Sequence, residues 1–258
     1  MTECVGAMSD DPILKFSGAG YVYPSGDSAF DAVELAVPKG ALVGLVGANG
    51  SGKSTIMCVA AGLYAPSSGS VRVESLTNPG DEKAIRSLCR LVMQDADLQI
   101  LGGTVEEDML LGSDRSESLL VRARDLAARF RLSEYWDRPV QSLSWGMKRK
   151  LCMASALLDD PAVLLLDEPF SGLDYPGIGE MRGLIKENKT RGLTQIVSSH
   201  DLECLVDMVD ALALLDNGRL VASGPPDEVL PLVAAHGVRP PCSWFLGQGV
   251  APWETGES

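Results

Sequence analysis

The sequence predicts an α/β protein with a parallel sheet at its centre and helices on both faces. Short apolar runs alternate along the chain with segments whose apolar residues recur at helical spacing, as in successive β-α-β units. A glycine-rich loop at 47–52 lies directly between one such strand and one such helix. The stretch from about 105 to 157 departs from the alternation, because apolar positions within it recur at helical spacing. We therefore expect one sheet-centred unit that carries a mostly helical insertion.

In the first half of the chain, the strands are short apolar runs separated by glycine and polar residues. Strands are predicted at 13–16, 33–37, 41–46, 71–74 and 90–93. The first two flank a region rich in Gly, Ser and Asp, which predicts a hairpin. The run at 41–46 is apolar throughout and bounded by glycines, as expected of a strand buried on both faces. An amphipathic helix from Thr55 to Leu63 follows the glycine-rich loop.

In the second half, strands and helices alternate again after the insertion. The apolar positions that define the insertion's helical spacing are Leu119, Leu120, Ala123, Leu126, Ala127 and Phe130. Strands are predicted at 162–166, 194–198 and 211–215, with a helix at 176–190 among them. Beyond Pro225 a short helix leads into a tail rich in Gly, Pro and Trp, to which the sequence assigns no element.

The composition limits the classes of partner. The chain has 258 residues, with 22 Lys and Arg against 35 Asp and Glu, a net charge of −13. Such an acidic surface disfavours nucleic acid and a polybasic membrane patch. Apolar runs are too short for a membrane span, and the N-terminus lacks the pattern of a secretory signal. The six cysteines are scattered without a Cys-x-x-Cys pair, which favours a reducing cytosol over a disulfide framework.

The segment GANGSGKST, residues 47–55, fits the phosphate-binding pattern G-x-x-x-x-G-K-[ST]. Its position after a predicted strand and before a predicted helix is the context that this motif requires. Glycines allow backbone amides to point at phosphate oxygens, and the helix N-terminus adds partial positive charge. Lys53 would reach the β- and γ-phosphates and Ser54 would ligate Mg²⁺. The alternative is a tight strand-to-helix turn that happens to contain a lysine.

Two carboxylates, Asp167 and Glu168, follow the apolar strand at 162–166. The carboxyl end of a buried parallel strand is where α/β sheets place their ligands. Asp167 would hold the Mg²⁺ shell and Glu168 would polarise the water that attacks the γ-phosphate. A solvated strand end is the alternative. Together with the phosphate loop, the pair predicts an Mg-dependent nucleoside triphosphatase.

Further motifs carry a family resemblance. They are LSWGMKRK at 143–150, SGLD at 171–174 and SSHD at 198–201. With the phosphate loop, Gln94 and Asp167-Glu168, they resemble the ATP-binding-cassette (ABC) ATPase family over about residues 13–230. The resemblance implies a P-loop NTPase fold of the ABC type: a RecA-like parallel sheet, an N-terminal antiparallel β subdomain and an α-helical subdomain at about 97–157. The ATPase domain would span 13–232, followed by a short tail at 233–258.

Roles for individual residues follow from this resemblance. Tyr23 would stack on adenine, and His200 would contact the γ-phosphate and orient Glu168 or the water. ATP would be bound by Tyr23, Gly47, Asn49, Gly50, Ser51, Gly52, Lys53, Ser54, Thr55, Ser144, Gly146 and Asp174. Mg²⁺ would be held by Ser54, Gln94 and Asp167, and catalysis would involve Glu168, His200, Gln94 and Lys53. His236 stands outside every motif and is interpreted as a surface residue.

The signature segment departs from the family's Leu-Ser-Gly-Gly-Gln at Trp145 and Met147. Ser144 and Gly146, which by resemblance face the γ-phosphate, are retained, so we expect function to survive. In this family the phosphate loop of one subunit closes on the signature of another. Because the chain has one copy of each motif, the resemblance implies a dimer with a second ABC ATPase subunit.

The segment MQDADLQILGGTVEEDMLLG is similar to energy-coupling-factor importers, including cobalt and nickel transport ATPases. This similarity implies an integral membrane partner that docks near Gln94, Gln99 and Glu106–Asp108, and a peripheral location on the cytoplasmic face of the membrane. The segment at 104–108 also fits a helix start capped by Thr104, with Glu107 completing a capping box, and both interpretations can hold together. The alternatives are a soluble ABC ATPase without a transport role and another class of ABC transporter. The substrate, a metal ion or a vitamin, is not encoded here.

Overall fold

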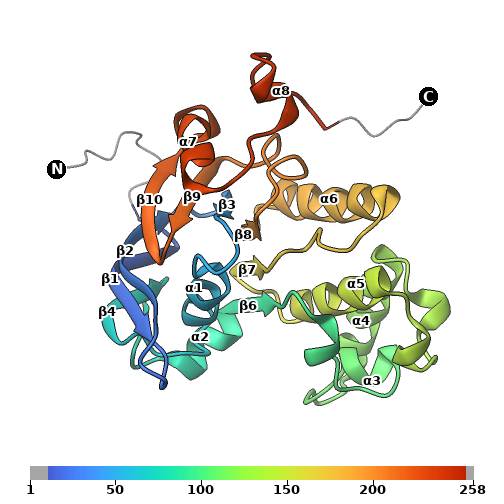
Figure 1. Cartoon of the computed structure of the whole chain (residues 1–258). Helices are drawn as coiled ribbons and strands as arrows, with labels where there is room; N and C mark the ends of the chain where they lie inside the picture. Colours follow the sequence, from blue (N-terminus) through green and yellow to red (C-terminus); the bar gives the residue numbers. More distant parts are fainter. Residues whose placement is uncertain (1–10, 254–258) are drawn as a thin grey trace.

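A computed structural model describes residues 11–253, which form two sheets with helices around them (Figure 1). The larger sheet has six strands in the order β10-β9-β3-β8-β7-β6, and the smaller has four in the order β2-β1-β4-β5. In the larger sheet β3, β6, β7, β8 and β9 run parallel, and only β10 is antiparallel. The predicted fold class is therefore confirmed.

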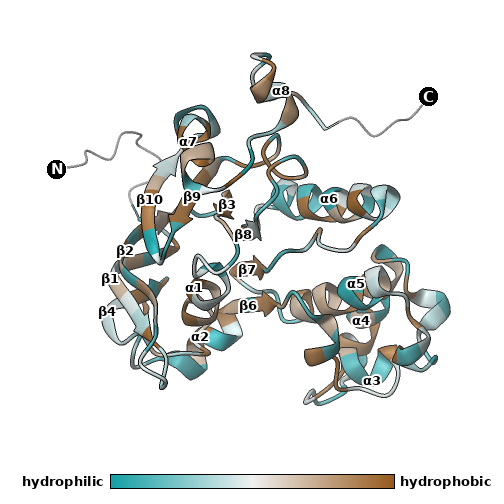
Figure 2. Ribbon diagram, viewed as in Figure 1, coloured by the Kyte–Doolittle hydropathy of each residue, from teal (hydrophilic) through white to brown (hydrophobic). Residues whose placement is uncertain are grey.

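The strands of the larger sheet are β3 (Leu42–Val46), β6 (Cys89–Val92), β7 (Val163–Leu166), β8 (Thr194–Ser199), β9 (Ala211–Asp216) and β10 (Arg219–Gly224). Successive residues of β7 fall in two different apolar clusters: Val163 and Leu165 in one, Leu164 and Leu166 in the other. The pleat sends alternate side chains to opposite faces, so the sheet is buried on both faces at β7. Figure 2 shows β3, β6, β7 and β9 as mainly hydrophobic ribbons.

The smaller sheet comprises β1 (Leu14–Val22), β2 (Ser28–Val37), β4 (Ser68–Val73) and β5 (Leu76–Asn78), and it is antiparallel throughout. β1 and β2 extend well beyond the predicted 13–16 and 33–37, into the polar hairpin region. Register shifts interrupt the pairing of β1 with β2 after Phe16, which weakens the alternation on which the prediction relied. β5 is too short to have been predicted.

The insertion contains only helical elements (Figure 1). They are η1 (Ala96–Leu98), α3 (Val105–Met109), α4 (Glu117–Arg129), η2 (Ser133–Tyr135), η3 (Val140–Ser142) and α5 (Trp145–Leu157). Thr104 caps α3, because its Oγ1 accepts a hydrogen bond from the Glu107 amide at 3.2 Å. The return bond of the capping box is displaced by one residue, since Glu107 accepts from the Gly103 amide at 2.9 Å.

The remaining helices cover the sheets or follow them. They are α1 (Lys53–Ala60), α2 (Glu82–Leu88), α6 (Tyr175–Thr190), α7 (Pro226–Val233), η4 (Ala234–His236) and α8 (Cys242–Phe245). The sequence did not predict α2 or α8, both of which are too short to make helical periodicity visible. In residues 11–253, no helix combines the length and apolar character needed to cross a membrane.

Candidate nucleotide site

The glycine-rich loop leaves β3 at Val46 and enters α1 at Lys53. Two of its glycines are sterically required. A Cβ at Gly47 would lie 2.3 Å from the Leu215 carbonyl oxygen, and one at Gly52, whose φ is +103°, would lie 2.6 Å from that of Ala29. The loop can therefore bend closely around its own interior, as a phosphate cradle must.

Lys53 lies over this loop. Its ammonium donates to the carbonyl oxygens of Gly47 at 2.8 Å and Ala48 at 3.0 Å, and only 6% of the residue is exposed. Burial lowers the pKa of Lys53, while the charges of Glu168 and Asp167 act in the opposite direction. The nearest carboxylate oxygen of Glu168 is 3.8 Å from its Nζ. The lysine is thus held at the mouth of the loop, with the carboxylate beside it.

The carboxyl end of β7 places the second group of predicted residues. Glu168 is buried, has a left-handed backbone with φ +47°, and donates its amide to Ser198 Oγ at 2.8 Å. Ser198 in turn donates to Asp167 Oδ1, and His200 Nδ1 lies 2.8 Å from Glu168 Oε2. Strands β7 and β8 are neighbours in the sheet, which is why the two motifs meet. A strained backbone at Glu168 is typical of a site where geometry serves function.

Lys53 and Glu168 share one cavity of about 560 Å³ with the predicted adenine-side residue. Tyr23 lines it, and its hydroxyl forms a 2.6 Å hydrogen bond with Thr55 Oγ1 while its ring meets Tyr21 edge-on at 5.2 Å. Gln94 is exposed on the same wall. The predicted residues in the lining are Tyr23, Asn49, Gly50, Ser51, Gly52, Lys53, Ser54, Thr55, Gln94 and Glu168. The size suits a small ligand.

The donor set fits a phosphate ligand with a hard cation. The Ser51 hydroxyl is buried and lacks a hydrogen-bond partner within the described part of the chain, as expected of a group that faces a ligand. Ser54, Gln94 and Asp167 offer hydroxyl, amide and carboxylate oxygens, the donors that Mg²⁺ prefers. These three groups are fewer than the six ligands that Mg²⁺ takes, so phosphate oxygens and water would supply the remaining ligands. Residues 11–253 contain no cluster of three His, Cys, Asp or Glu that would hold a metal unaided.

Three predicted nucleotide residues lie elsewhere. Ser144, Gly146 and Asp174 line a separate cavity of about 410 Å³, which shares no residue with the first. Ser144 Oγ caps α5 by accepting from the Met147 amide at 3.3 Å, and Asp174 Oδ1 caps α6 by accepting from the Gly177 amide at 3.0 Å. The predicted nucleotide residues of one chain therefore line two separate cavities.

A residue to which the sequence assigned no role connects these parts. Arg149 of α5 is 3% exposed and donates to the carbonyl oxygens of Glu168, Pro169 and Gln94 at 3.0, 2.8 and 3.1 Å. Its guanidinium also lies 5.4 Å from the centre of the Trp145 ring. Arg149 follows the signature motif in a polar run, so only its burial distinguishes it from its lysine neighbours. Trp145 thus has a packing role next to the site.

Two of the residues predicted to meet a membrane partner border a third cleft, of about 580 Å³, between the insertion and β6, whereas Gln94 lines the nucleotide cavity. Gln99 and Asp108 line it, together with the exposed leucines Leu63, Leu98 and Leu111. The Gln99 amide is itself bound to β6 and the residue after it, accepting from the Met93 amide and donating to the Leu91 carbonyl.

The carboxylates of 106–108 hold nearby groups. Glu106 accepts from the Trp136 indole at 2.9 Å, and Asp108 accepts from the Leu101 and Gly102 amides. These side chains thus shape the loop at 101–104, and Asp108 alone of the three lines the cleft.

His236 is not the plain surface residue that was predicted. It is half-buried, and its Nδ1 lies 2.9 Å from Asp216 Oδ2 at the end of β9. The prediction missed this contact because the C-terminal segment folds back onto the sheet, and no sequence motif indicates that packing.

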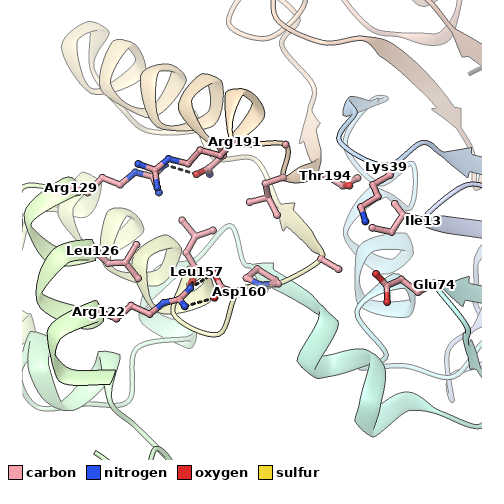
Figure 3. Close-up of a pocket in the computed structure, with 15 residues that line it drawn as sticks. Ile13, Lys39, Glu74, Arg122, Leu126, Arg129, Leu157, Asp160, Arg191 and Thr194 are labelled. Atoms are coloured by element: carbon pink, nitrogen blue, oxygen red, sulfur yellow. Dashed lines mark hydrogen bonds and ion pairs between the residues drawn. The ribbon is translucent and has the colours of Figure 1, made fainter. Parts of the chain in front are cut away.

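A further cavity, of about 370 Å³, lies near the amino ends of β7 and β8, far along the strands from the phosphate loop (Figure 3). Its arginines include two that are paired: Arg122 with Asp160, and Arg129 with Glu187 at 3.0 Å. It belongs to the junction of the insertion with the two sheets.

A phosphate loop, a carboxylate pair at a strand end and a histidine directly after the neighbouring strand define a P-loop nucleotide-binding protein. Residues 30–171 match the family described as ABC transporter. The chain is 36% identical to the cobalt import ATP-binding protein CbiO of Rhodobacter capsulatus, over 89% of this chain and 86% of that one. It is 31% identical to the energy-coupling factor transporter ATP-binding protein EcfA of Methanosphaera stadtmanae, over 84% and 81%.

Among solved structures, it is similar to cbiO1 of Clostridium perfringens, described as part of the ABC transporter complex cbiONQ. The TM-score is 0.77 at 28% identity, covering 86% of this chain and 92% of that one. The chain therefore belongs to the ATP-binding proteins of the ABC transporter family.

Proposed function

We propose that this protein is the Mg-dependent ATP-hydrolysing subunit of an ABC importer of the energy-coupling-factor type. The observation that carries the proposal is the meeting of Lys53, Glu168 and His200 beside the glycine-rich loop, with Lys53 Nζ at 3.8 Å and His200 Nδ1 at 2.8 Å from the Glu168 carboxylate. The similarity to CbiO and EcfA proteins supports the transport role. The substrate would be a micronutrient, a cobalt or nickel ion or a vitamin.

In the proposed mechanism, the charged side chains that act on ATP are already held in place by the fold. Lys53 and the loop amides would neutralise the β- and γ-phosphates. Glu168 would accept the hydrogen bond of the attacking water, and His200, bound to the same carboxylate, would orient it and contact the γ-phosphate. When bound, Mg²⁺ would neutralise the developing charge on the phosphate oxygens, with Ser54, Gln94 and Asp167 as its protein ligands.

The functional unit would be a dimer. Ser144, Gly146 and Asp174 line a cavity of their own, which supports the proposal that they would reach a γ-phosphate across an interface with a second ABC ATPase subunit. The N-terminus of α5, a helix of 13 residues, would then face the anion. One solved neighbour, similar to this chain at the level of fold, is an ATP-binding cassette described as dimeric and bound to ADP and phosphate.

An integral membrane subunit would dock in the cleft between the insertion and β6. The exposed fractions of Leu98 and Leu111 are 69% and 58%, and Leu63 adds a third apolar side chain to the rim. An amphipathic helix of the partner could bury these leucines. Arg149 would link the docked helix to the site, since it binds the carbonyl of Gln94 on one side and that of Glu168 on the other. The protein would thus lie peripherally on the cytoplasmic face of the membrane.

Two assays test this function. Lys53→Ala should lose ATP affinity or turnover, and Glu168→Gln should bind ATP but hydrolyse it very slowly, since such groups each contribute several kcal/mol in phosphoryl transfer. Equal hydrolysis by Glu168→Gln would refute its role. Co-purification with an integral membrane protein would support the importer, whereas ATP hydrolysis with no membrane partner would favour a soluble ABC ATPase.

A further inference from the structure

The C-terminal segment 239–253 lies along the two connections that carry His200 and Asp174. Arg239 forms an isolated parallel bridge with Asp201, directly after His200. The Cys242 amide donates to Glu203 at 2.8 Å, and the Trp253 amide donates to Asp207 at 3.1 Å. The segment therefore contacts the β8–β9 connection at three positions, Asp201, Glu203 and Asp207.

Trp253 also reaches the other connection. Its ring lies 4.8 Å from the ring of Tyr175, the residue that follows Asp174 and opens α6, with 34° between their planes. The Arg182 guanidinium, about two turns further along α6, lies 4.8 Å from the Trp253 ring centre. A single side chain is thus packed against the start of α6 and against a residue in its middle.

The Arg182 side chain that contacts the Trp253 ring also belongs to a buried ion pair. Arg182 donates to both carboxylate oxygens of Asp207 at 2.8 and 2.7 Å, and the two side chains are only 3% and 8% exposed. Arg182 also donates to the Cys204 carbonyl. Asp207 is therefore shared, since it accepts from α6 through Arg182 and from the tail through the Trp253 amide. Both bonds to Asp207 come from Nη2, while Nη1 holds the Cys204 carbonyl, so one guanidinium ties α6 to two points of the β8–β9 connection by charge-assisted hydrogen bonds.

From these contacts we infer that Trp253 is a positioning residue for ATP hydrolysis. It would hold the His200 connection and the Asp174 turn in one fixed relation, through Asp207 on one side and Tyr175 on the other. His200 serves the phosphate-loop half-site, and Asp174 serves the half-site presented to the second subunit. The tail would thereby align the two half-sites of one chain, an inference that rests on the composite site proposed above.

The chain provides its own controls. Trp253→Ala removes the ring from Tyr175 and Arg182, whereas Trp253→Phe retains an aromatic face for both. Phe245→Ala deletes an aromatic side chain of the same tail that is 77% exposed. All three are made in the full chain, and each is assayed for ATP turnover, for equilibrium binding of Mg-ATP and for thermal unfolding.

We expect kcat of Trp253→Ala to fall roughly tenfold, since a displacement of about 1 Å at a reacting group can cost up to about 10²-fold. KM and the Kd for Mg-ATP should stay near the parent values, because the aromatic and cationic contacts of the ring lie on α6 and not on the phosphate loop. Trp253→Phe should restore most of the turnover, and Phe245→Ala should match the parent. Parental turnover in Trp253→Ala would overturn the inference, as would a parallel loss of ATP binding, which would make Trp253 merely structural.

Hydrogen exchange separates this inference from the proposed function, because it needs no ATP hydrolysis. In Trp253→Ala, amide exchange should rise in residues 201–209 and in the first turn of α6, and remain unchanged in α1. Unchanged exchange in both connections would refute the positioning role even if the protein is an active ATPase. Increased exchange in a chain that hydrolyses no ATP would instead contradict the proposed function and leave the link between the connections supported.

Discussion

Arg149→Lys perturbs a side chain that joins α5 to both segments of the nucleotide site, the one around Glu168 and the one around Gln94. The guanidinium uses Nη1 for the carbonyls of Glu168 and Pro169 and Nη2 for the carbonyl of Gln94, at 2.8 to 3.1 Å. A lysine keeps the charge but donates from a single point, so it can serve one side of the fork and not both.

The expected cost follows from this geometry. At least one carbonyl in the site loses its donor, which costs about 1–3 kcal/mol. For a chain of this size each kcal/mol shifts Tm by roughly 2–4 °C. We also expect a lower kcat, because Gln94 and Glu168 are no longer held by one group. Thermal unfolding followed by circular dichroism gives the first quantity, and steady-state ATP hydrolysis gives the second.

Lys148→Met is the matched control, one residue away on the same helix. Lys148 pairs at 2.5 Å with Asp97, whose side chain is 54% exposed, and such pairs contribute about 0–1 kcal/mol. If Arg149→Lys unfolds at the parental temperature and hydrolyses ATP as the parent does, the guanidinium fork does not connect the two segments, and Arg149 has no linking role.

Further predictions concern stability at low pH, the cleft between the insertion and β6, and two glycines. Burial raises the pKa of Asp207, but hydrogen bonds from Arg182 and the Trp253 amide, with nearby positive charge, hold it below its ordinary value. Its contribution to stability is therefore present above the unfolded pKa of about 3.9 and is lost as pH falls through the lower folded value. Asp207→Asn should unfold at a lower Tm than the parent at pH 7, with the gap closing below about pH 4; a gap independent of pH would contradict this. Leu98→Glu should abolish capture of the membrane subunit while ATP hydrolysis persists. The control Leu232→Glu, on α7 and 41% exposed, should keep both capture and hydrolysis, and equal capture by the two variants would exclude the cleft as the docking site. Gly47→Ala should lose ATP binding in a fluorescent-nucleotide titration, because its Cβ would meet a carbonyl oxygen at 2.3 Å. Gly183→Ala, in open space on α6, should instead raise stability by about 0.5–1 kcal/mol, and a Tm below the parent's would show that helix propensity does not govern this site.

The sheet was predictable because its signal is local. Val163–Leu166 and Thr194–Ser199 are fully buried strands, and continuous apolar runs between turn residues predict such strands directly. The phosphate loop was equally predictable, because its motif is local; the close contacts at Gly47 and Gly52, 2.3 and 2.6 Å for an added Cβ, explain why glycine stands at those two positions.

Elements with weak local signals escaped prediction. β10 alternates between exposed and half-buried positions at a sheet edge, and its sequence, RLVASG, has too few apolar residues to mark a strand. Its place is fixed by pairing with β9.

The unpredicted site residues are those whose roles arise only from long-range packing. Arg149 lies among lysines in sequence, and only the closure of α5 onto the strand end buries it. Trp253 and His236 acquire their contacts only because the C-terminal segment folds back onto Asp207 and Asp216. Such contacts join residues 19 to 55 positions apart, beyond the reach of periodicity or motif spacing.

In the proposed mechanism, one chain carries two complementary halves of an ATP site. Sedimentation of the purified Glu168→Gln variant is the sharpest test of this composite site, because slow hydrolysis would trap the ATP-bound state. We predict a monomer without nucleotide and a dimer with saturating Mg-ATP, and loss of that dimer when Ser144→Arg is added. A Glu168→Gln protein that stays monomeric with saturating Mg-ATP, although it binds the nucleotide, would show that the two halves do not combine across subunits.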